Sequence, residues 1–369
     1  MDSVTWIGIA TSVKPKLRTI AGGKRVRRPA QQYVRITQAA AKQYGARVCL
    51  FDPHSVDWNN GTIDAWTPQD PQHPERDWVN RSVRLPDVIY ENVFVHLAVQ
   101  GYVSELRRQA AKRNIPLYNP ILPGKWRMIS VLKAAGLADY TPTTERLSSA
   151  AQVRDRLRKW GTIYVKPIGG YGGLNVHRIE RQPDGTYRMS VDRTKSATRH
   201  KRTIMTAEEL DKWTHAHRSG YLLQRGLHLM TVGGRKVDFR VVLHRDRHGE
   251  WQLVGIVPKL AATDGVVTNV IAGGERSDVK AFEQAAAREG KQVPWAALER
   301  RAKEIAAVLS KRHPSVGLVG FDMGVEDDGT ISMIEMNPKP ARSLLNRPML
   351  ERLAEYTAGF AVYLAKRKR

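Results

Sequence analysis

An Asp-Gly pair at 328–329 separates two β-prone apolar runs near the end of the chain. This pair is a strong signal for a two-residue hairpin turn, and a hairpin turn fixes which residues of its two strands face each other. With this turn Asp327 pairs with Thr330, and counting outward predicts that Asp322 lies directly opposite Glu335. Like charges at this range are destabilising unless a cation lies between them. The hairpin therefore constrains both the fold and its chemistry.

The two faces of this hairpin differ in polarity. Side chains alternate along a strand, so Asn337 shares the face of Asp322 and Glu335. Oxygen ligands of this type suit Mg²⁺ or Mn²⁺, which predicts a metal site. The other interpretation is a solvated hairpin whose acids pair with Lys339 or Arg342. The opposite face is predicted to be core and carries Phe321, Met323, Val325, Ile334 and Met336.

A glycine-rich segment after a β run indicates a second binding element. Lys166 ends the run TIYVK, and a second β run begins near His177. The four glycines between them are Gly169, Gly170, Gly172 and Gly173. Glycine lets backbone N–H groups close around an anion, and the lysine adds charge, so the segment is predicted to cover phosphates. An ordinary hairpin is the alternative. The pattern is not a dinucleotide fingerprint, because Asn175 replaces the third glycine and a strand follows.

The order of apolar segments predicts an α+β chain. In the first third, β runs such as VTWIGIA and ARVCLFD alternate with helical patterns, which indicates a small parallel sheet flanked by helices. From residue 221 onward the strands are separated by Gly and Asp-Gly turns, so antiparallel pairs dominate the second half. A stripe with helical spacing near the end predicts a core face or a homodimer face; it consists of Leu350, Leu353, Thr357, Phe360 and Leu364.

The chain is strongly basic, with a formal net charge of +24 at pH 7 and a pI near 10.3. Such a field attracts anions, so the partner is predicted to be an anionic small molecule with phosphate or carboxylate groups, or a nucleic acid, and the sign of the charge does not decide between them. The basic residues concentrate in 14–28, 193–202 and 366–369. Solvated surface is the other interpretation of each cluster.

The cysteine count and the hydropathy of the chain indicate the cellular compartment in which the protein is expected. Cys49 is the only cysteine, so neither a disulfide framework nor a cysteine zinc site is predicted. His215 and His217 have no third ligand nearby and indicate a surface helix. The N-terminal run does not resemble a signal peptide, and no segment reaches the roughly 18 apolar residues of a membrane helix. A soluble cytoplasmic protein without a membrane partner is expected.

The order of the motifs resembles the ATP-grasp superfamily of ligases, over residues 120–345. GKWRMISVLKAAGL resembles the helix with a first nucleotide lysine, here Lys125. YVKPIGGYGGLNV resembles the second lysine, Lys166, with its phosphate-covering loop. YLLQRGL resembles the linker that borders the adenine, which implies Gln224, Arg225 and Gly226.

The acidic hairpin completes this resemblance. FDMGVEDDGTISMIEMNPKPAR resembles the magnesium signature, which implies the ligands Asp322, Glu335 and Asn337. DFRVVL, GIVPKLA and VVTNVIAGG look most like the endospore coat-associated YheC/YheD group, and glutathione-synthetase-like ligases are more distant.

The resemblance implies an ATP-grasp fold, in which two α+β subdomains clasp ATP behind a small N-terminal α/β domain. The expected ranges are 1–120, 121–225 and 226–369. It also implies a carboxylate–amine ligase that uses ATP and Mg²⁺ and forms an amide through an acyl phosphate, on an anionic amino acid or peptide.

Further catalytic residues follow from the resemblance. Arg240 in DFRVV is expected to grip the transferred phosphoryl group, and an ion pair with Asp238 is the structural alternative. Lys259 stands where related ligases are expected to carry arginine, which keeps the charge but loses a bidentate grip. Asn269 is expected to help shape this site.

Two other functions remain open from the sequence. A protein that binds spore surfaces or polyanions would keep the fold and use its charge for adhesion. A phosphotransferase would release a stable phosphorylated product without forming an amide. Arg342 and Ser343, just past the metal strand, are expected either to bind a substrate carboxylate or to be structural.

Overall fold

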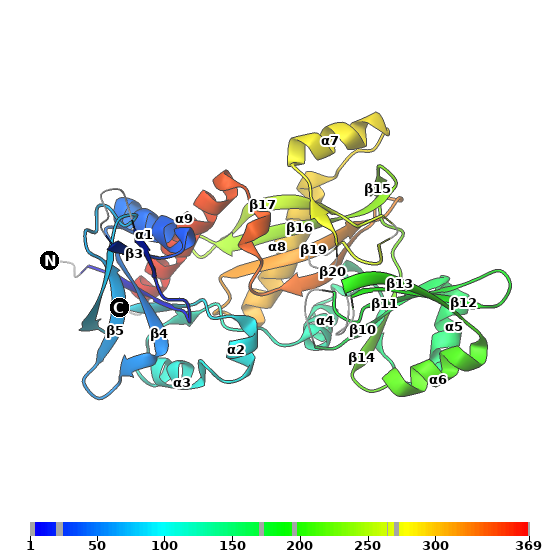
Figure 1. The fold of residues 1–369 in the computed structure, drawn as a ribbon, viewed down its shortest axis with the longest axis horizontal. Helices are drawn as coiled ribbons and strands as arrows, with labels where there is room; N and C mark the ends of the chain where they lie inside the picture. The colour runs from blue at the N-terminus through cyan, green and yellow to red at the C-terminus, as the bar shows by residue number, and fades with distance from the viewer. Residues whose placement is uncertain are drawn as a thin grey trace.

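The described part of the chain folds into three β-sheets arranged in a row, with a separate two-stranded ribbon (Figure 1). This computed structural model describes residues 4–19, 25–169, 173–193, 198–263, 265–268 and 273–367. The predicted α+β class is confirmed. None of the described helices combines the length and the apolar character needed to cross a bilayer.

The N-terminal sheet is mixed. Its strands are β1 (Trp6–Ala10), β4 (Arg47–Asp57), β5 (Thr62–Pro68), β6 (Trp78–Arg84), β7 (Val88–Glu91) and β8 (Leu117–Tyr118), in the order β6-β5-β4-β1-β7-β8. β4, β1, β7 and β8 run parallel. The prediction of a parallel sheet missed β5 and β6, which extend it as an antiparallel hairpin. In β5, Ile63 and Ala65 are buried while Asp64 between them is exposed, an alternation typical of an antiparallel strand with one solvated face.

Helices and the ribbon complete the N-terminal region. They are β2 (Lys16–Thr19) and β3 (Arg25–Arg28), which form the ribbon, and the helices α1 (Gln31–Tyr44), α2 (Val95–Val99) and α3 (Ser104–Lys112). α1 ends at Gly45, whose φ of 60° lets its N–H reach back to the carbonyl of Ala41 at 3.1 Å.

The last helix, α9 (Arg347–Arg367), packs on the first sheet and on α1. The Tyr118 hydroxyl donates to the carbonyl oxygen of Thr357 at 3.0 Å, and the Tyr118 and Phe360 rings meet edge to face. All five residues of the predicted stripe are buried or partly buried against the cores on either side of α9. The stripe is therefore a core face and not a homodimer face.

The middle sheet is antiparallel throughout. Its strands are β9 (Thr144–Arg146), β10 (Thr162–Pro167), β11 (His177–Arg181), β12 (Tyr187–Arg193), β13 (Thr198–Met205) and β14 (Tyr221–Arg225), in the order β13-β12-β11-β10-β14-β9. α5 (Ala150–Trp160) and α6 (Ala207–His217) pack on one face. The glycine-rich segment connects β10 to β11, which pair antiparallel as predicted.

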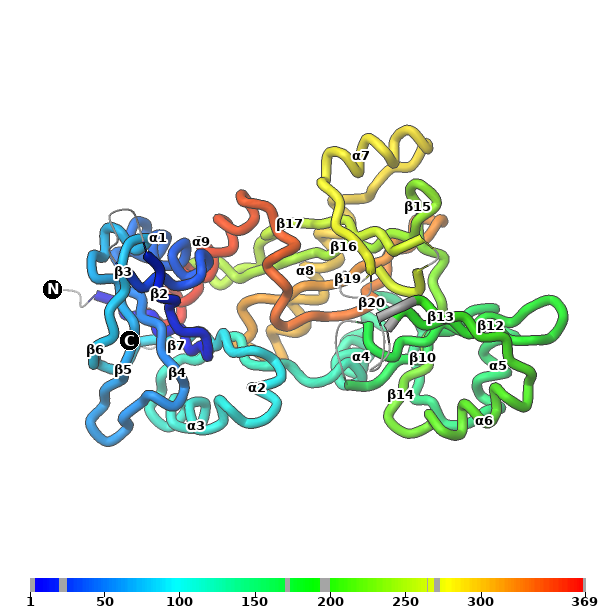
Figure 2. Tube along the Cα trace, in the orientation of Figure 1, coloured from blue at the N-terminus to red at the C-terminus, as the bar shows by residue number. Residues whose placement is uncertain are grey.

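The C-terminal sheet is also antiparallel. Its strands are β15 (Thr231–Val232), β16 (Arg235–Arg245), β17 (Trp251–Leu260), β18 (Glu275–Arg276), β19 (Leu318–Val325) and β20 (Ile331–Asn337), in the order β18-β17-β16-β19-β20, with β15 paired to β16. One face packs against α4 (Lys125–Ala134), α7 (Val279–Arg288) and α8 (Trp295–Arg312). The start of α9 packs on the other face, through Met349 and Leu353. The tube trace in Figure 2 shows the C-terminal sheet lying between the other two.

The turn between β19 and β20 differs from the prediction. The Glu326 N–H bonds to the carbonyl oxygen of Thr330 at 2.8 Å, so the loop comprises residues 327–329 and not two residues. Gly329 has a φ of 83°, the left-handed conformation that ends a three-residue hairpin loop. The predicted two-residue turn is therefore wrong.

A bulge in β20 compensates for this error. Ile334 is inserted between the pairs Met323–Met333 and Asp322–Glu335. The extra residue restores the register, so the predicted opposition of Asp322 and Glu335 is confirmed. Ile334 was predicted on the core face, but it lines a pocket instead, because a bulge turns two successive side chains toward similar directions.

Candidate functional site

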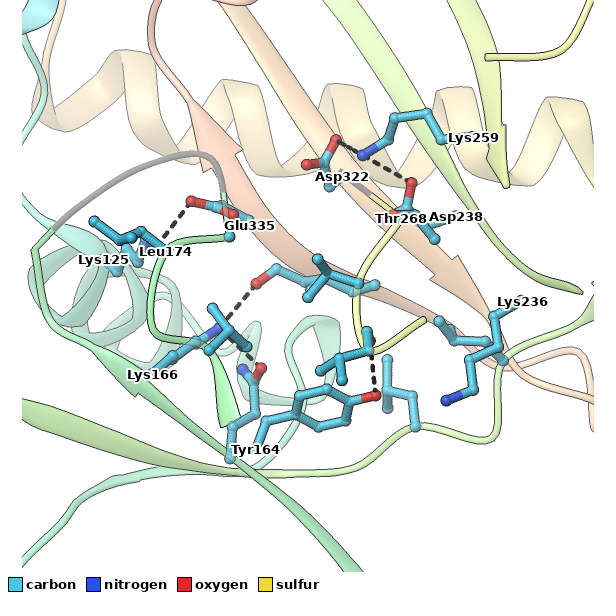
Figure 3. Close-up of a pocket in the computed structure, with 18 of the residues that line it drawn as sticks. Lys125, Tyr164, Lys166, Leu174, Lys236, Asp238, Lys259, Thr268, Asp322 and Glu335 are labelled. Carbon is cyan, nitrogen blue, oxygen red and sulfur yellow. Dashed lines mark hydrogen bonds and ion pairs between the residues drawn. The ribbon is translucent and has the colours of Figure 1, made fainter. Parts of the chain in front are cut away.

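A pocket lies between the middle and C-terminal sheets, where β10 and β14 face β19 and β20 (Figure 3). Many predicted site residues line it: Lys125, Lys166, Gly169, Gly173, Gln224, Arg225, Lys259, Asp322 and Glu335. Leu227, Leu229 and Ile334 add an apolar wall. Three predicted residues, Gly170, Gly172 and Asn269, lie outside the described residues.

Lys166 extends from β10 into the pocket. Its Nζ donates to Gln224 Oε1 at 2.8 Å and to the carbonyl oxygen of Ile334 at 3.3 Å. Burial, and to a smaller extent the charge of Lys125, lower the pKa of Lys166 to about 8, although Glu335 opposes the change. Lys166 is only 6% exposed, and its ammonium group has no carboxylate within ion-pair distance among the described residues. An anion entering the pocket would supply the missing charge.

Lys125 is the first residue of α4 and faces Glu335. Their Nζ and Oε1 atoms are 3.0 Å apart, with the side chains 19% and 25% exposed. Glu335 is thus compensated by Lys125, and not by Lys339 or Arg342 as the solvated-hairpin interpretation required. Because both groups are partly exposed, either can exchange this partner for a ligand.

Asp322 is held by two buried cations. Arg240 lies opposite it across β16 and β19, and the Arg240 Nη2 donates to Asp322 Oδ2 at 3.0 Å. Lys259 Nζ is 3.1 Å from Asp322 Oδ1. Burial opposes ionisation of Asp322, but the two cations outweigh it and hold the pKa of this carboxyl well below its usual range. Arg240 therefore pairs with Asp322, and the alternative pairing with Asp238 is wrong.

Lys259 also reaches a second acid. Its Nζ lies 2.9 Å from Asp238 Oδ1, and the Thr268 hydroxyl donates to the other oxygen of Asp238. Burial lowers the pKa of Lys259, but Asp238 and Asp322 more than offset this, so the pKa is raised overall. Burial raises the pKa of Asp238 despite Lys259 beside it. The result is a buried chain of alternating charges along one wall of the pocket.

One functional contact has no signal in the sequence. Asp192 of β12 is buried, and its Oδ2 accepts from the backbone N–H groups of Val266 and Val267 at 2.7 and 2.9 Å. Both valines line the pocket, and Tyr164 donates to the carbonyl oxygen of Val266 at 3.3 Å. Asp192 of the middle sheet thus fastens part of the segment after β17, which forms a wall of the pocket. Asp192 and Val266 are separated by 74 positions in the sequence, which explains why local patterns do not reveal the contact.

The segment after β14 is only partly as predicted. Arg225 lines the pocket and forms a two-point ion pair with Glu326, at 2.9 and 3.3 Å. Gly226 is not among the pocket-lining residues. A Cβ on Gly226 would lie 2.7 Å from the Thr162 side chain, so glycine is required there for the close approach of β10.

The segment after β20 contacts the N-terminal sheet. Lys339 Nζ lies 3.1 Å from Oε1 of the fully buried Glu91 and donates to the Val93 carbonyl at 3.0 Å. Arg342 donates through Nη2 to the Tyr90 hydroxyl at 2.9 Å and to Asn92 Oδ1 at 3.3 Å. Lys339 and Arg342 therefore contact the carboxyl end of β7, and ligand sites in parallel sheets usually lie at the carboxyl ends of strands. Ser343 is exposed in a short 3₁₀ turn, Arg342–Leu344.

The predicted metal ligands are close together. Asn337 Nδ2 lies 3.5 Å from Asp322 Oδ2, and Glu335 pairs with Asp322 across the strands. Among the described residues no group of three or more His, Cys, Asp and Glu side chains is placed to hold a metal ion. A metal here would therefore depend on two carboxylates, one amide and the oxygens of a ligand, a set that suits Mg²⁺.

Comparison with known proteins gives consistent matches. The YheC/D-like ATP-grasp family model matches residues 114–364. Endospore coat-associated protein YheD of Bacillus subtilis is 24% identical over 341 residues, which is 88% of this chain and 72% of YheD. The fold is similar to the ATP-grasp ligase PsnB, solved with minimal precursor, Mg and ADP, at 12% identity and a TM-score of 0.51 over 98% of both chains. It is also similar to a RiPP-associated ATP-grasp ligase of Chryseobacterium gregarium, solved with ADP and a leader and core peptide. That match has 11% identity and a TM-score of 0.51, over 98% of this chain and 97% of the other.

Proposed function

The chain belongs to the YheC/D-like ATP-grasp family, and on this basis we propose that it is an ATP- and Mg²⁺-dependent ligase that joins a carboxylate to an amine. The observation that carries the proposal is the pocket, where Lys125, Lys166 and the opposed acids Asp322 and Glu335 converge from two sheets. We also assign the predicted ranges 1–120, 121–225 and 226–369 to an N-terminal domain and two grasping subdomains.

Such a reaction proceeds in two balanced steps. A carboxylate oxygen attacks the γ-phosphorus of ATP, and the bond between this phosphorus and the oxygen that bridges to the β-phosphate breaks. ADP is released, and the product is an acyl phosphate. The amine nitrogen then attacks the acyl carbon, the bond from that carbon to the phosphate oxygen breaks, and the phosphate departs with the bonding electrons and takes up the proton that the nitrogen loses. No side chain has to form a covalent bond, so the protein contributes position and charge.

The lysines are assigned to the phosphates. Lys166 is buried and has no carboxylate partner among the residues that the structure describes, so a phosphate would compensate its charge. Lys125 would leave Glu335 for the phosphate chain, and the segment Gly169–Gly173 would cover it. Gln224 and Arg225, with the apolar wall, are assigned to the adenine end.

The acids are assigned to the metal. Asp322, Glu335 and Asn337 would hold Mg²⁺, or Mn²⁺, which neutralises charge between the phosphates. Lys259 would orient Asp322 from behind, because it is buried and contacts that carboxylate directly. Arg240 would orient Asp322 in the same way through its ion pair with that carboxylate, and we keep its predicted role of gripping the transferred phosphoryl group. Asn269 keeps its predicted role beside this group.

The substrate is assigned to the cavity at the end of β7. Arg342 lines this cavity and uses only its Nη2 for contacts with described residues, which leaves Nε and Nη1 for an anionic group. The peptides bound in the similar structures support an amino acid or peptide as the substrate. Ser343 is exposed one residue further on and is the weaker assignment.

The decisive experiment measures ADP release with Mg²⁺ over a panel of amino acids and dipeptides, with mass spectrometry of the products. An amide product that disappears in Glu335→Gln supports the ligase. The matched control is Glu299→Gln, which removes an equally ion-paired glutamate on α8, and it should retain activity. A stable phosphorylated product would instead identify a phosphotransferase. If no pair supports ADP release and ADP does not bind, the proposal is wrong.

A second candidate function is polyanion binding by the β2–β3 ribbon. Its basic side chains form no ion pair with a described residue; they are Lys16, Arg18, Arg25, Arg27 and Arg28. The name of YheD, endospore coat-associated, would fit adhesion at a spore and a spore-associated location besides the cytoplasm. Fluorescence anisotropy with labelled polyglutamate at increasing salt tests this, because polyanion binding must weaken steeply. Affinity that does not change with salt or in Arg18→Ala would exclude it.

A further inference from the structure

A second groove opens beside the nucleotide pocket. The two cavities share Lys125, Lys166, Gly169, Ile334 and Glu335. The groove continues away from these residues between α2, the segment 121–129 and the end of β20. Figure 2 shows α2 on the side of the N-terminal region that faces α4. The groove therefore leads from the surface to the charged residues assigned to the phosphates.

The walls of this groove are apolar. Phe94 and Val99 are 56% and 71% exposed, which places them among the few large hydrophobic side chains that the described residues leave exposed. Val95 and Val99 lie one helical turn apart and line the same side of α2, whereas Ala98 is buried in the core beneath. Apolar side chains gathered in a groove with a polar rim typically mark a binding site.

The far end of the groove is cationic. Phe94, Val95 and Lys339 line both the groove and the cavity that contains Arg342. The Lys339 amine is satisfied by Glu91 and the Val93 carbonyl, so among the described residues that line this end Arg342 is the cation with donors left for a ligand. An occupant thus meets Lys166 and the Lys125–Glu335 ion pair at one end, Arg342 at the other end, and apolar side chains between them.

We propose that this groove selects the substrate: an amino acid or short peptide with a bulky apolar side chain next to an anionic group. The apolar side chain would pack on Phe94 and Val99, the anionic group would bind Arg342, and the reacting group would lie at the junction with the nucleotide pocket. The part of this proposal that concerns the reacting group rests on the proposed ligase function. Binding in the groove does not, because the groove and its charges are present without turnover.

The first test needs no ATP. Anilinonaphthalene sulfonate, which combines aromatic rings with an anion, serves as the probe in a fluorescence titration. The double variant Phe94→Ser/Val99→Ser and the single variant Arg342→Gln should each weaken its binding about tenfold. The control is Ile204→Ser, which removes an equally exposed hydrophobic residue from β13 in the middle sheet and should leave binding unchanged. Equal loss in the control, or no loss in the groove variants, overturns the proposal.

The second test uses turnover. With leucine and phenylalanine as probes, the double variant should raise KM about tenfold and leave kcat within about twofold, since these side chains contact a part of the substrate that does not react. With alanine and aspartate the KM should stay as in the unmodified protein. A uniform change for all four amino acids would contradict apolar selection. If no amino acid turns over, the ligase proposal fails while the fluorescence test still decides the groove.

Discussion

The pocket lysine Lys166 leads to an unusual expectation: removing it should stabilise the protein at neutral pH. Its pKa is lowered from 10.5 to about 8, mainly by burial. Each pKa unit corresponds to about 1.4 kcal/mol, so holding the ammonium group in place costs about 3 kcal/mol. Lys166→Met abolishes this cost but leaves the buried Gln224 oxygen without its donor, which costs about 2 kcal/mol. The expected net effect at pH 7 is a gain of about 1 kcal/mol.

The sign of this effect should reverse with pH. The unfolded chain binds the lysine proton more strongly than the folded chain, so the cost is complete below about pH 8 and fades as the pH approaches 10.5. At pH 10 less than about 1 kcal/mol of it remains. Lys166→Met should then be less stable than the unmodified protein by about 1 kcal/mol, because the lost hydrogen bonds dominate.

Urea titrations at pH 7 and pH 10, followed by circular dichroism, measure this difference. The matched control is Lys280→Met on the exposed face of α7, which should show no reversal. A second readout is calorimetry of ADP binding at pH 8 in buffers of different ionisation enthalpy. The phosphates should raise the pKa of Lys166, so binding should take up protons in the unmodified protein and not in Lys166→Met. A destabilised Lys166→Met with the same deficit at both pH values would refute the reasoning.

Three further predictions follow from the site. Asp322→Asn should lower the free energy of unfolding by about 3–5 kcal/mol, because it leaves buried cations uncompensated, whereas Glu335→Gln should cost under about 1 kcal/mol because its ion pair is partly exposed. Equal losses in urea titrations would contradict this ordering. Asp192→Asn should weaken ADP binding about tenfold and speed amide exchange at Val266; unchanged exchange would show that the carboxylate does not anchor this segment. Gly226→Ala should lower stability by about 1–3 kcal/mol through the clash with β10. Gly169→Ala, where the added Cβ meets nothing within 4 Å, is its control, and equal melting temperatures would exclude the clash.

The Asp-Gly signal correctly predicted a hairpin with Asp322 opposite Glu335, but it predicted the wrong loop length. An Asp-Gly pair suits loops of two or three residues, since both need a residue with positive φ. The sequence does not distinguish these loops, and no local pattern marks the bulge at Ile334, whose side chain lines the pocket. The three-residue loop and the bulge at Ile334, neither of which was predicted, shift the register in opposite directions, so Asp322 still lies opposite Glu335.

The family and the fold were predictable because their motifs are contiguous. Four motifs in order predicted the ATP-grasp fold and the YheC/YheD resemblance, which are confirmed. What could not be predicted joins segments far apart in the chain. Asp192 reaches Val266, and Glu326 pairs with Arg225 at a separation of 101 residues. Helical or strand periodicity carries no information about such partners, because it reports burial and not the identity of the neighbour.

The packing of α9 on the N-terminal sheet has a consequence for biosynthesis. Tyr118 and Thr357, which meet in that core, are 239 residues apart, and Phe360 fills the space beside Gly317 and Tyr118. A ribosome makes the N-terminal strands first and α9 after every other helix described. The first sheet is therefore synthesised before α9, the helix that covers one side of its core. That side stays uncovered until α9 has been translated. Until then, its exposed apolar side chains are a target for chaperones and for aggregation.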